Sequence, residues 1–146
     1  MVNNLNEKDF SLYKDFAHSP SKLKATIIAL KKQFPSRQLI ACMELHTFSS
    51  LNKNFLGEYK NSMHIADIAI IYFNTANLKQ KKLKKITKAE VQNAFNRDDL
   101  IVFTNSNKLE KYLETGKTKN QNILLMSSGN FNGINFEKLC KKRDVI

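Results

Sequence analysis

The chain contains few of the residues that break or cross-link a structure. Among its 146 residues are 4 glycines, 2 prolines, 2 cysteines and no tryptophan. This composition excludes collagen-like and low-complexity proteins, and 42% hydrophobic residues are enough to bury a core. Because 146 residues fit one ordinary domain, a complete multidomain enzyme is excluded as well. We therefore expect a single folded domain.

Long apolar stretches are also absent. The longest uninterrupted apolar run, residues 68–73, is far shorter than the roughly 20 residues that span a bilayer, and the polar amino terminus is not a signal peptide. Cys42 and Cys140 lie far apart without a CxxC partner, so we predict neither a disulfide framework nor a thiolate metal site. These features predict a soluble, cytoplasmic protein that does not contact the membrane.

Positive charge is in excess, but arginine is scarce. Lys and Arg total 24 against 13 Asp and Glu, and only Arg37, Arg97 and Arg143 are arginines. Six lysines lie between Lys79 and Lys88, and without them the net charge would fall from +11 to +5. Such a run is more often a solvated excursion than a phosphate-binding patch, and base recognition relies on the arginine fork. Nucleic-acid binding through these lysines is the alternative function, and the scarcity of arginine argues against it.

Short apolar runs alternate with segments of helical period. The pattern predicts strands at residues 10–16, 38–45, 66–73, 100–103 and 122–126. It predicts helices at residues 20–34, 51–59, 87–95, 106–116 and 134–142, the second capped by Ser49 or Ser50 and the third by a capping box of Thr87 and Glu90. Apolar strands alternating with helices indicate an α/β fold, a mostly parallel sheet with helices on both faces.

Polar turns follow three of the predicted strands, at residues 15–20 (DFAHSP), 44–50 (ELHTFSS) and 127–131 (SSGNF). In a parallel sheet, ligands bind beyond the carboxyl ends of the strands, where these turns begin. Each turn also has an ordinary structural interpretation: Asp15 as a turn former, His18 bonded to a helix N-terminus, Ser49 as a cap and Gly129 at a positive φ. Their expected position on one edge makes them candidates for a site.

Several familiar motifs are missing. Gly116 and the two residues after it resemble the end of a phosphate-binding loop, but Lys111 stands where GxxxxGK[ST] requires glycine, and Gly116 is better interpreted as a helix C-cap. His18, His46 and His64 lack metal-ligand spacing, so no metal site is predicted. The absence of a GxSxG motif argues against a hydrolase.

The strings DFAHSP, ACMELHTFSSLN and SSGNF together resemble the carboxy-terminal domain of the Mur ligase family. They are most similar to the murein peptide ligases, that is, UDP-N-acetylmuramate:L-alanyl-γ-D-glutamyl-meso-diaminopimelate ligases. The resemblance extends from about residue 12 to residue 136 and implies a Rossmann-like α/β fold. It also implies that residues 1–146 are the third domain of a ligase, without the central ATP-binding and amino-terminal UDP-binding domains.

The activity that the resemblance implies is ATP-dependent amide ligation in peptidoglycan recycling. In this reaction a murein tripeptide is joined to UDP-N-acetylmuramate through an acyl phosphate. The resemblance therefore implies that the tripeptide and UDP-N-acetylmuramate are the partners of the full-length enzyme. ATP and Mg²⁺ would bind mainly outside this chain, which is expected to be inactive alone. A free-standing nucleotide-binding regulator is a further possibility, and it would require measurable ATP affinity in this chain.

The resemblance also assigns residues by matching position, although it identifies no certain catalytic group. Asp15 would hydrogen-bond the nucleotide, with His18 nearby. The pocket for the amine-bearing substrate would be lined by His46, Ser49, Ser128, Gly129 and Asn130. Thr47 and Ser50 stand where alanine-adding relatives carry arginines, which disfavours free alanine as the substrate. The group that binds the carboxylates of the peptide is not identified by the sequence.

Overall fold

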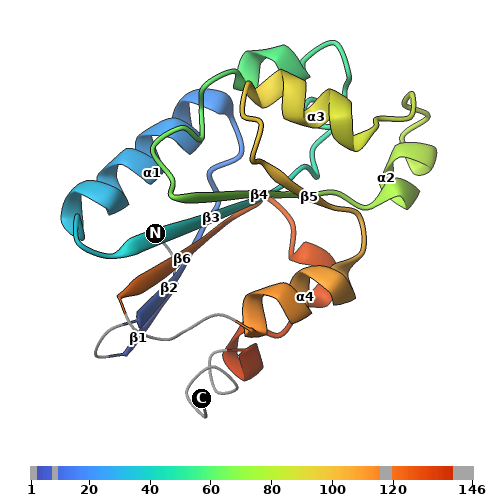
Figure 1. Cartoon of the computed structure of the whole chain (residues 1–146). Helices are drawn as coiled ribbons and strands as arrows, with labels where there is room; N and C mark the ends of the chain where they lie inside the picture. Colours follow the sequence, from blue (N-terminus) through green and yellow to red (C-terminus); the bar gives the residue numbers. More distant parts are fainter. Residues whose placement is uncertain (1–2, 8–9, 116–119, 140–146) are drawn as a thin grey trace.

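The computed structural model describes residues 3–7, 10–115 and 120–139, which form one six-stranded sheet with helices packed against it (Figure 1). The strand order is β1-β2-β6-β3-β4-β5. The strands are β1 (Asn3–Glu7), β2 (Phe10–Asp15), β3 (Gln38–Glu44), β4 (Ile68–Tyr72), β5 (Ile101–Phe103) and β6 (Gln121–Met126). Strand β1 pairs antiparallel with β2, and the other pairs are parallel. The carboxyl ends of five strands therefore share one edge of the sheet.

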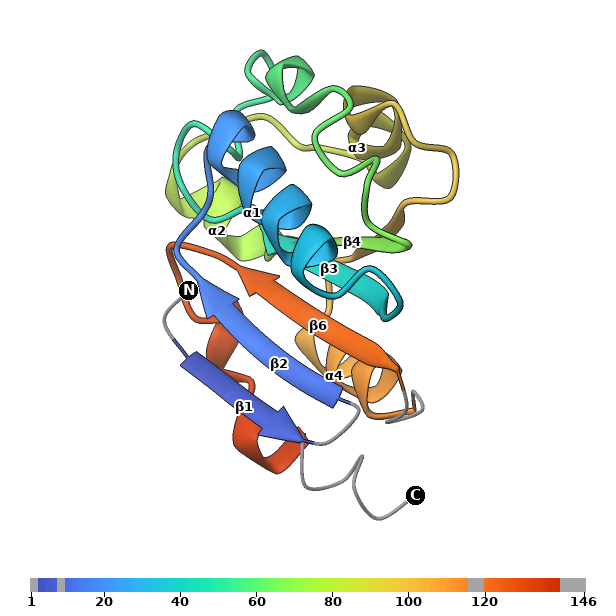
Figure 2. The same ribbon diagram turned by 90° about the vertical axis from the view of Figure 1, so that its left-hand side faces the viewer.

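Helices cover both faces of this sheet. They are α1 (Pro20–Gln33), α2 (Thr75–Gln80), α3 (Lys88–Phe95) and α4 (Ser106–Glu114), with short 3₁₀ turns η1 (Leu56–Tyr59) and η2 (Phe131–Gly133). Helices α1 and α3 lie on one face, whereas α4 and the segment after β6 lie on the other (Figures 1 and 2). The predicted α/β fold, a mostly parallel sheet between two helical layers, is confirmed.

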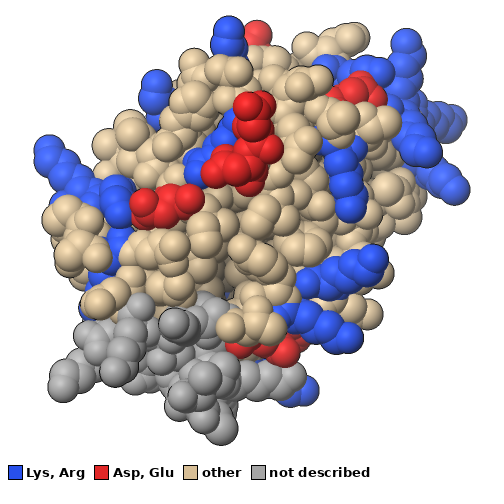
Figure 3. Space-filling model, in the orientation of Figure 1, with Lys and Arg blue, Asp and Glu red and all other residues tan. Residues whose placement is uncertain are grey.

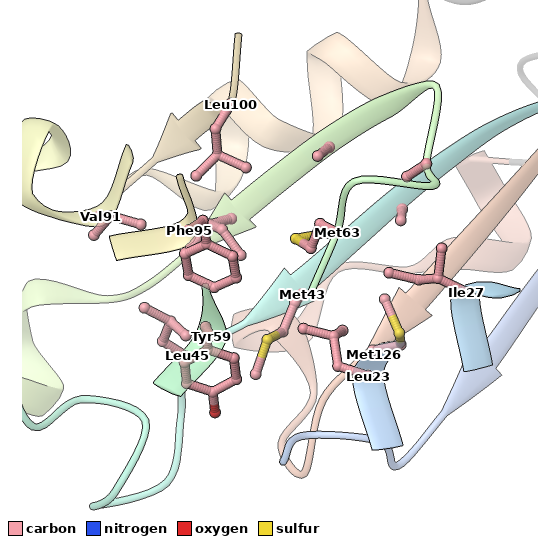
Figure 4. Packing of buried hydrophobic residues seen from close by; sticks show 14 of the residues in the cluster. Leu23, Ile27, Met43, Leu45, Tyr59, Met63, Val91, Phe95, Leu100 and Met126 are labelled. Atoms are coloured by element: carbon pink, nitrogen blue, oxygen red, sulfur yellow. The ribbon is translucent and has the colours of Figure 1, made fainter. Parts of the chain in front are cut away.

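The two-sided burial of the strands explains their nearly continuous apolar sequences. In β3, Leu39 and Met43 join the core cluster under α1 and α3, while Ile40 and Cys42 face the cluster under α4. Figure 4 shows part of the first cluster, with Leu23 of α1 packed near Met43. Successive strand residues point to opposite faces, so a strand covered on both sides needs apolar residues at every position.

Two helix starts agree with the sequence. Pro20 occupies the first turn of α1, and the buried positions Leu23, Ile27 and Leu30 recur at helical spacing. At the start of α3, Thr87 Oγ1 accepts a hydrogen bond from the Glu90 amide at 3.2 Å, and Glu90 Oε1 accepts one from the Thr87 amide at 3.2 Å. The predicted capping box is thus formed.

The helix predicted at residues 51–59 needs correction. Residues 51–59 do not form one α-helix, because the Thr47 hydroxyl accepts the Ser50 amide at 3.1 Å and turns precede the short η1. Thr47 therefore caps the turn before η1, the N-cap of η1 is Phe55, and neither Ser49 nor Ser50 acts as a helix cap. Helix α4 starts at Ser106, as predicted, and Asn105 is its N-cap.

Other elements were missed or lie partly outside the described residues. Polar β1 was not predicted, because its pairing with β2 uses backbone groups and needs no apolar pattern. Helix α2 was not predicted either, because it lies partly in the lysine-rich run. The C-cap assigned to Gly116 falls outside the described ranges. Of the helix expected at 134–142, residues 136–139 are helical, and residues 140–142 are not described.

Two arginines have internal structural roles. Arg97 donates hydrogen bonds to the carbonyl oxygens of Met63 at 2.6 Å and Ala66 at 2.7 Å. Arg37 donates to Asn122 Oδ1 at 3.0 Å, and its guanidinium lies 4.7 Å from the centre of the Phe34 ring. Their guanidinium groups therefore stabilise the fold.

The six lysines between Lys79 and Lys88 lie at the surface beside α2, where Figure 3 shows basic side chains gathered. Leu78 and Ile86 are buried and fix this segment to the core. The segment is therefore a packed excursion with lysines pointing outwards. Within the described part of the chain, no helix has the length and apolar character needed to cross a membrane.

Candidate functional site

The three polar turns predicted from the sequence lie side by side at the carboxyl edge of the sheet. They follow β2, β6 and β3, which are neighbours in that order. Asp15 is paired in register with Met126, and Met43 is paired with the same residue from the other side. The Ser127 amide continues this ladder by donating to the Asp15 carbonyl at 3.0 Å. The topology therefore assembles one polar rim from segments that are distant in sequence.

A buried carboxylate fixes two of these turns to each other. Glu44, at the end of β3, is 2% exposed, and its Oε1 accepts a 2.7 Å hydrogen bond from the Ser127 hydroxyl. The same oxygen accepts the Phe131 amide at 2.9 Å, and Ser127 Oγ accepts the Gly129 amide at 2.7 Å. Hydrogen bonds to an ionised acceptor are among the stronger ones in proteins. Glu44 therefore determines the shape of the turn at residues 127–131.

His46 packs directly on the backbone of this turn. A Cβ atom added at Gly129 would lie 2.9 Å from His46 Cγ and 3.0 Å from Glu44 Oε1. Gly129 is not among the described glycines with positive φ, so the prediction of a positive φ at this residue was wrong. Glycine is required here because His46 and Glu44 approach its Cα too closely for a side chain. His46 Nδ1 is buried without a hydrogen-bond partner among the described atoms and lies 4.0 Å from Glu44 Oε2. The rest of the ring reaches the surface, since the side chain is 41% exposed.

The first turn, residues 15–20, is held by its own polar groups and by the core. Asp15 Oδ1 accepts the Ala17 amide at 3.0 Å. His18 Nδ1 lies 2.7 Å from the Phe16 carbonyl, and because a carbonyl only accepts, Nδ1 must bear the proton. In the neutral ring, Nε2 is then an acceptor. The Tyr59 hydroxyl donates to the His18 carbonyl at 2.6 Å, and burial raises the pKa of Tyr59 to about 12, which keeps this donor protonated.

A cavity of about 290 Å³ opens between the end of β2 and the segment after β6. Three predicted site residues line it, namely Asp15, Gly129 and Asn130. The rest of the lining is largely apolar and comprises Phe16, Leu125, Phe131, Ile134 and Phe136, together with Ser127, Gly133 and Lys14. The resemblance assigns Asp15 to the nucleotide and Gly129 and Asn130 to the amine-bearing substrate, so residues expected to bind two different ligands line the same cavity.

The other predicted site residues lie around this cavity rather than in its lining. His46 is linked to it through Gly129, and His18 through the turn that contains Phe16. Ser128 and Ser49 are exposed, and the Ser49 carbonyl accepts a local hydrogen bond from the Asn52 amide at 3.1 Å. The structure thus places Ser49 in a surface turn.

Sequence reasoning missed three residues of this region: Lys14, Glu44 and Ser127. Glu44 had one available signal, a carboxylate directly after the apolar run at residues 39–43. The buried hydroxyl of Ser127 could not be distinguished from its exposed neighbour Ser128 without the structure. Lys14 was one of many lysines, and only the packing places it in the cavity.

The residue types at this rim suit organic ligands better than metal ions. No group of three or more His, Cys, Asp and Glu side chains suited to a metal occurs within residues 3–7, 10–115 and 120–139. A carboxylate acceptor at Asp15 is suited to ribose hydroxyls. Burial, followed by the charge of Glu44, raises the pKa of the Cys42 thiol, so this cysteine remains a protonated core residue.

No family model matches the chain. Solved structures do resemble it. A domain assigned to a UDP-N-acetylmuramate:L-alanyl-γ-D-glutamyl-meso-diaminopimelate ligase of Haemophilus ducreyi has a TM-score of 0.64 at 21% identity, over 97% of this chain and 99% of that one. A murein peptide ligase of Psychrobacter arcticus has a TM-score of 0.70 at 22% identity, over 94% of this chain. The MurF ligase of Thermotoga maritima in complex with ADP has a TM-score of 0.56 at 18% identity, over 98% of this chain.

These structural neighbours are Mur ligases, and the chain has the Rossmann-like fold of their carboxy-terminal domains. The chain corresponds to the whole of the H. ducreyi domain but spans only 28% of the P. arcticus ligase and 30% of the MurF ligase. At this level of identity the similarity shows the fold, and the resemblance stated from the sequence agrees with it.

Proposed function

We propose that residues 1–146 are the carboxy-terminal domain of an ATP-dependent amide ligase that joins a murein tripeptide to UDP-N-acetylmuramate in peptidoglycan recycling. The observation that supports this most directly is the convergence of the three turns that resemble the family at one edge of the sheet. The structural likeness to a murein peptide ligase over 94% of the chain supports it further. An enzyme of this kind works in the cytoplasm, where ATP and UDP-sugars are available.

The reaction explains why such an enzyme needs separate domains. A carboxylate does not expel oxide, so the γ-phosphoryl group of ATP is first transferred to it, giving an acyl phosphate and ADP. The neutral amine of the tripeptide then attacks the acyl carbon, and the amide forms as phosphate and a proton leave. A domain that brings the amine to the acyl phosphate raises the rate by positioning. We assign this delivery role to the present chain.

The turn at residues 15–20 is assigned to the nucleotide. Asp15 supplies an acceptor at the rim, and the Nδ1–H hydrogen bond of His18 leaves Nε2 as the acceptor of a neutral ring. ATP and Mg²⁺ would be held mainly by a central domain outside this chain, in agreement with the lack of glycine-rich phosphate loops in the sequence. We therefore expect the chain alone to be inactive and to bind ATP weakly.

The turns at residues 44–50 and 127–131 are assigned to the amine-bearing peptide. His46 is held at the rim by Gly129, with its Nδ1 against Glu44 and the rest of its ring partly exposed. Gly129 and Asn130 line the cavity, and Ser128 is an exposed residue of the same turn. Ser49 is the weakest assignment, since it lies in the surface turn beside this rim.

The first test is the coding sequence that surrounds this segment. We expect an upstream GxxxxGK[ST] loop in the same reading frame, and an open reading frame limited to these residues would contradict the proposal. The second test is activity of the encoded full-length protein. We expect release of phosphate and ADP that requires both UDP-N-acetylmuramate and the tripeptide L-alanyl-γ-D-glutamyl-meso-diaminopimelate. Omitting either substrate is the control, and release that is indifferent to the tripeptide would contradict the assignment.

A further inference from the structure

Lys14 is a basic residue whose side chain lines the cavity described above. It lies on β2 opposite Leu125 of β6, which also lines the cavity. Its Nζ lies 4.9 Å from the centre of the Phe136 ring, a cation–π distance. Among the described side chains, no carboxylate lies within 4.0 Å of this ammonium. Lys14 therefore offers a positive charge beside an apolar wall, without an acidic partner from the described part of the fold.

The composition of the cavity favours one kind of anion. Phe131, Ile134 and Phe136 give it an apolar wall that suits a short hydrocarbon stem. One ammonium matches the single charge of a carboxylate. A phosphate dianion would need further donors, and Asp15 in the same lining repels it about twice as strongly as it repels a singly charged carboxylate. The volume of about 290 Å³ is near the lower end of ligand pockets and suits an amino-acid side chain or a peptide end.

We infer that this cavity binds a carboxylate on a short apolar stem and that Lys14 is the residue that pairs with it. Under the proposed function, the ligand is a carboxylate-bearing arm of the tripeptide. Only this choice of ligand rests on the proposed function, whereas the carboxylate site itself does not. Lys14 then supplies the positive charge that binds the peptide carboxylate. Thr47 and Ser50 cannot supply it, because neither side chain is charged. It determines specificity, since it discriminates a peptide with a free carboxylate from one without.

The experiment uses the chain itself and follows the methyl resonances of Leu125 and Ile134 during titration. The probes are glutarate, the tripeptide, the tripeptide with its carboxylates converted to carboxamides, and ADP. The variants are Lys14→Met, which keeps the aliphatic stem but not the charge, and Lys14→Arg, which keeps the charge. Lys24→Met, at an exposed position of α1, is the matched control. Amide spectra of all variants check that the fold is retained.

We expect glutarate and the tripeptide to shift both methyl groups saturably in the wild type and in Lys24→Met. Lys14→Met should weaken the binding of both ligands roughly tenfold, and Lys14→Arg should keep most of the wild-type affinity. The carboxamide form should bind to the wild type as weakly as the tripeptide binds to Lys14→Met. The inference would be overturned if Lys14→Met bound the tripeptide and glutarate as tightly as the wild type does. It would also be overturned if neither ligand gave a saturable shift in the wild type. If ADP is the probe that depends on Lys14, the site binds phosphate and the carboxylate assignment is wrong.

Failure of this inference and failure of the proposed function give different results. If glutarate binds through Lys14 and the tripeptide does not, the carboxylate site is supported and the ligase proposal loses its peptide. If the tripeptide instead shifts the resonances of His46 and Asn130 equally in the wild type and in Lys14→Met, the inference is wrong and the ligase proposal stands.

Discussion

The carboxylate of Glu44 and the hydroxyl of Ser127 are joined by a 2.7 Å hydrogen bond, although 83 positions separate the two residues. The Phe131 amide donates to the same oxygen at 2.9 Å. Because Glu44 is 2% exposed, loss of its carboxylate would leave these donors unpaired in the interior. The geometry of the turn at residues 127–131 therefore depends on a residue of another strand.

Replacing Glu44 should destabilise the fold in a graded way. We expect Glu44→Ala to lower the free energy of unfolding by about 1–3 kcal/mol, the cost of leaving buried polar groups unpaired. Glu44→Gln should cost less, because its amide oxygen can still accept from Ser127 and Phe131. Urea unfolding measures both, and a double-mutant cycle with Ser127→Ala should show a coupling of about 0.5–3 kcal/mol. Additive effects would mean that the hydrogen bond contributes little.

Gly129 offers a second test of the packing at the rim. Gly129→Ala should push the His46 ring from its position and destabilise the chain by about 1–3 kcal/mol, because its Cβ would lie 2.9 Å from the ring. Gly57→Ala is the matched control, since a Cβ there meets nothing within 4 Å. Urea unfolding and the imidazole proton shifts of His46 report the two effects. Unchanged shifts in Gly129→Ala would show that the ring does not rest on this residue.

The sequence predicted the parallel core of the fold well, because burial on both faces leaves a strong apolar signal. Strands β3, β4 and β6 coincide closely with uninterrupted apolar runs, and the side-chain caps of α3 were visible as Thr87 and Glu90. Elements held by backbone pairing or by local turns left no such signal. Strand β1 is polar, and the turn around Thr47 uses a hydroxyl that competes with helix formation.

For the site, the sequence predicted the correct edge of the sheet but not the side chains that shape it. The rule that ligands bind at the carboxyl ends of parallel strands placed Asp15, His46 and Gly129 together. Burial decided the rest, and burial of single polar residues is a tertiary property. Glu44 and Lys14 both occupy strand ends, yet one is enclosed in the core and the other faces a cavity.

Tyr59 should give the protein an alkaline instability. Burial raises its pKa from 10.0 to about 12, so the unfolded chain loses the phenolic proton first. The stabilisation that comes from this pKa difference is fully present below pH 10 and is lost as the pH rises to about 12. The free energy of unfolding should therefore fall by about 1 kcal/mol between pH 8 and pH 11 through this group. Urea unfolding at both values tests this, with Tyr59→Phe as the variant in which that part of the loss is absent.

Asp15 and His46 should separate the two sides of the proposed cleft in the full-length ligase. We expect Asp15→Ala to raise the KM for ATP roughly tenfold, because a charged acceptor for the nucleotide is lost. Asp15→Asn keeps an oxygen that can accept from the Ala17 amide, and it controls for collapse of the turn. His46→Ala should instead raise the KM for the tripeptide more than that for ATP. The reverse pattern would mean that the two assignments are exchanged.

The lysine-rich segment tests the alternative function. Lys82, Lys84, Lys85 and Lys88 are exposed, while buried Ile86 between them holds the segment in place. Changing the four lysines to glutamine should therefore leave the urea midpoint nearly unchanged. Under the ligase proposal, the wild-type chain binds a generic DNA duplex weakly at about 150 mM salt, because its described arginines Arg37 and Arg97 make internal contacts. Tight duplex binding whose affinity falls steeply with salt, and which the glutamine variant loses, would instead support nucleic-acid binding.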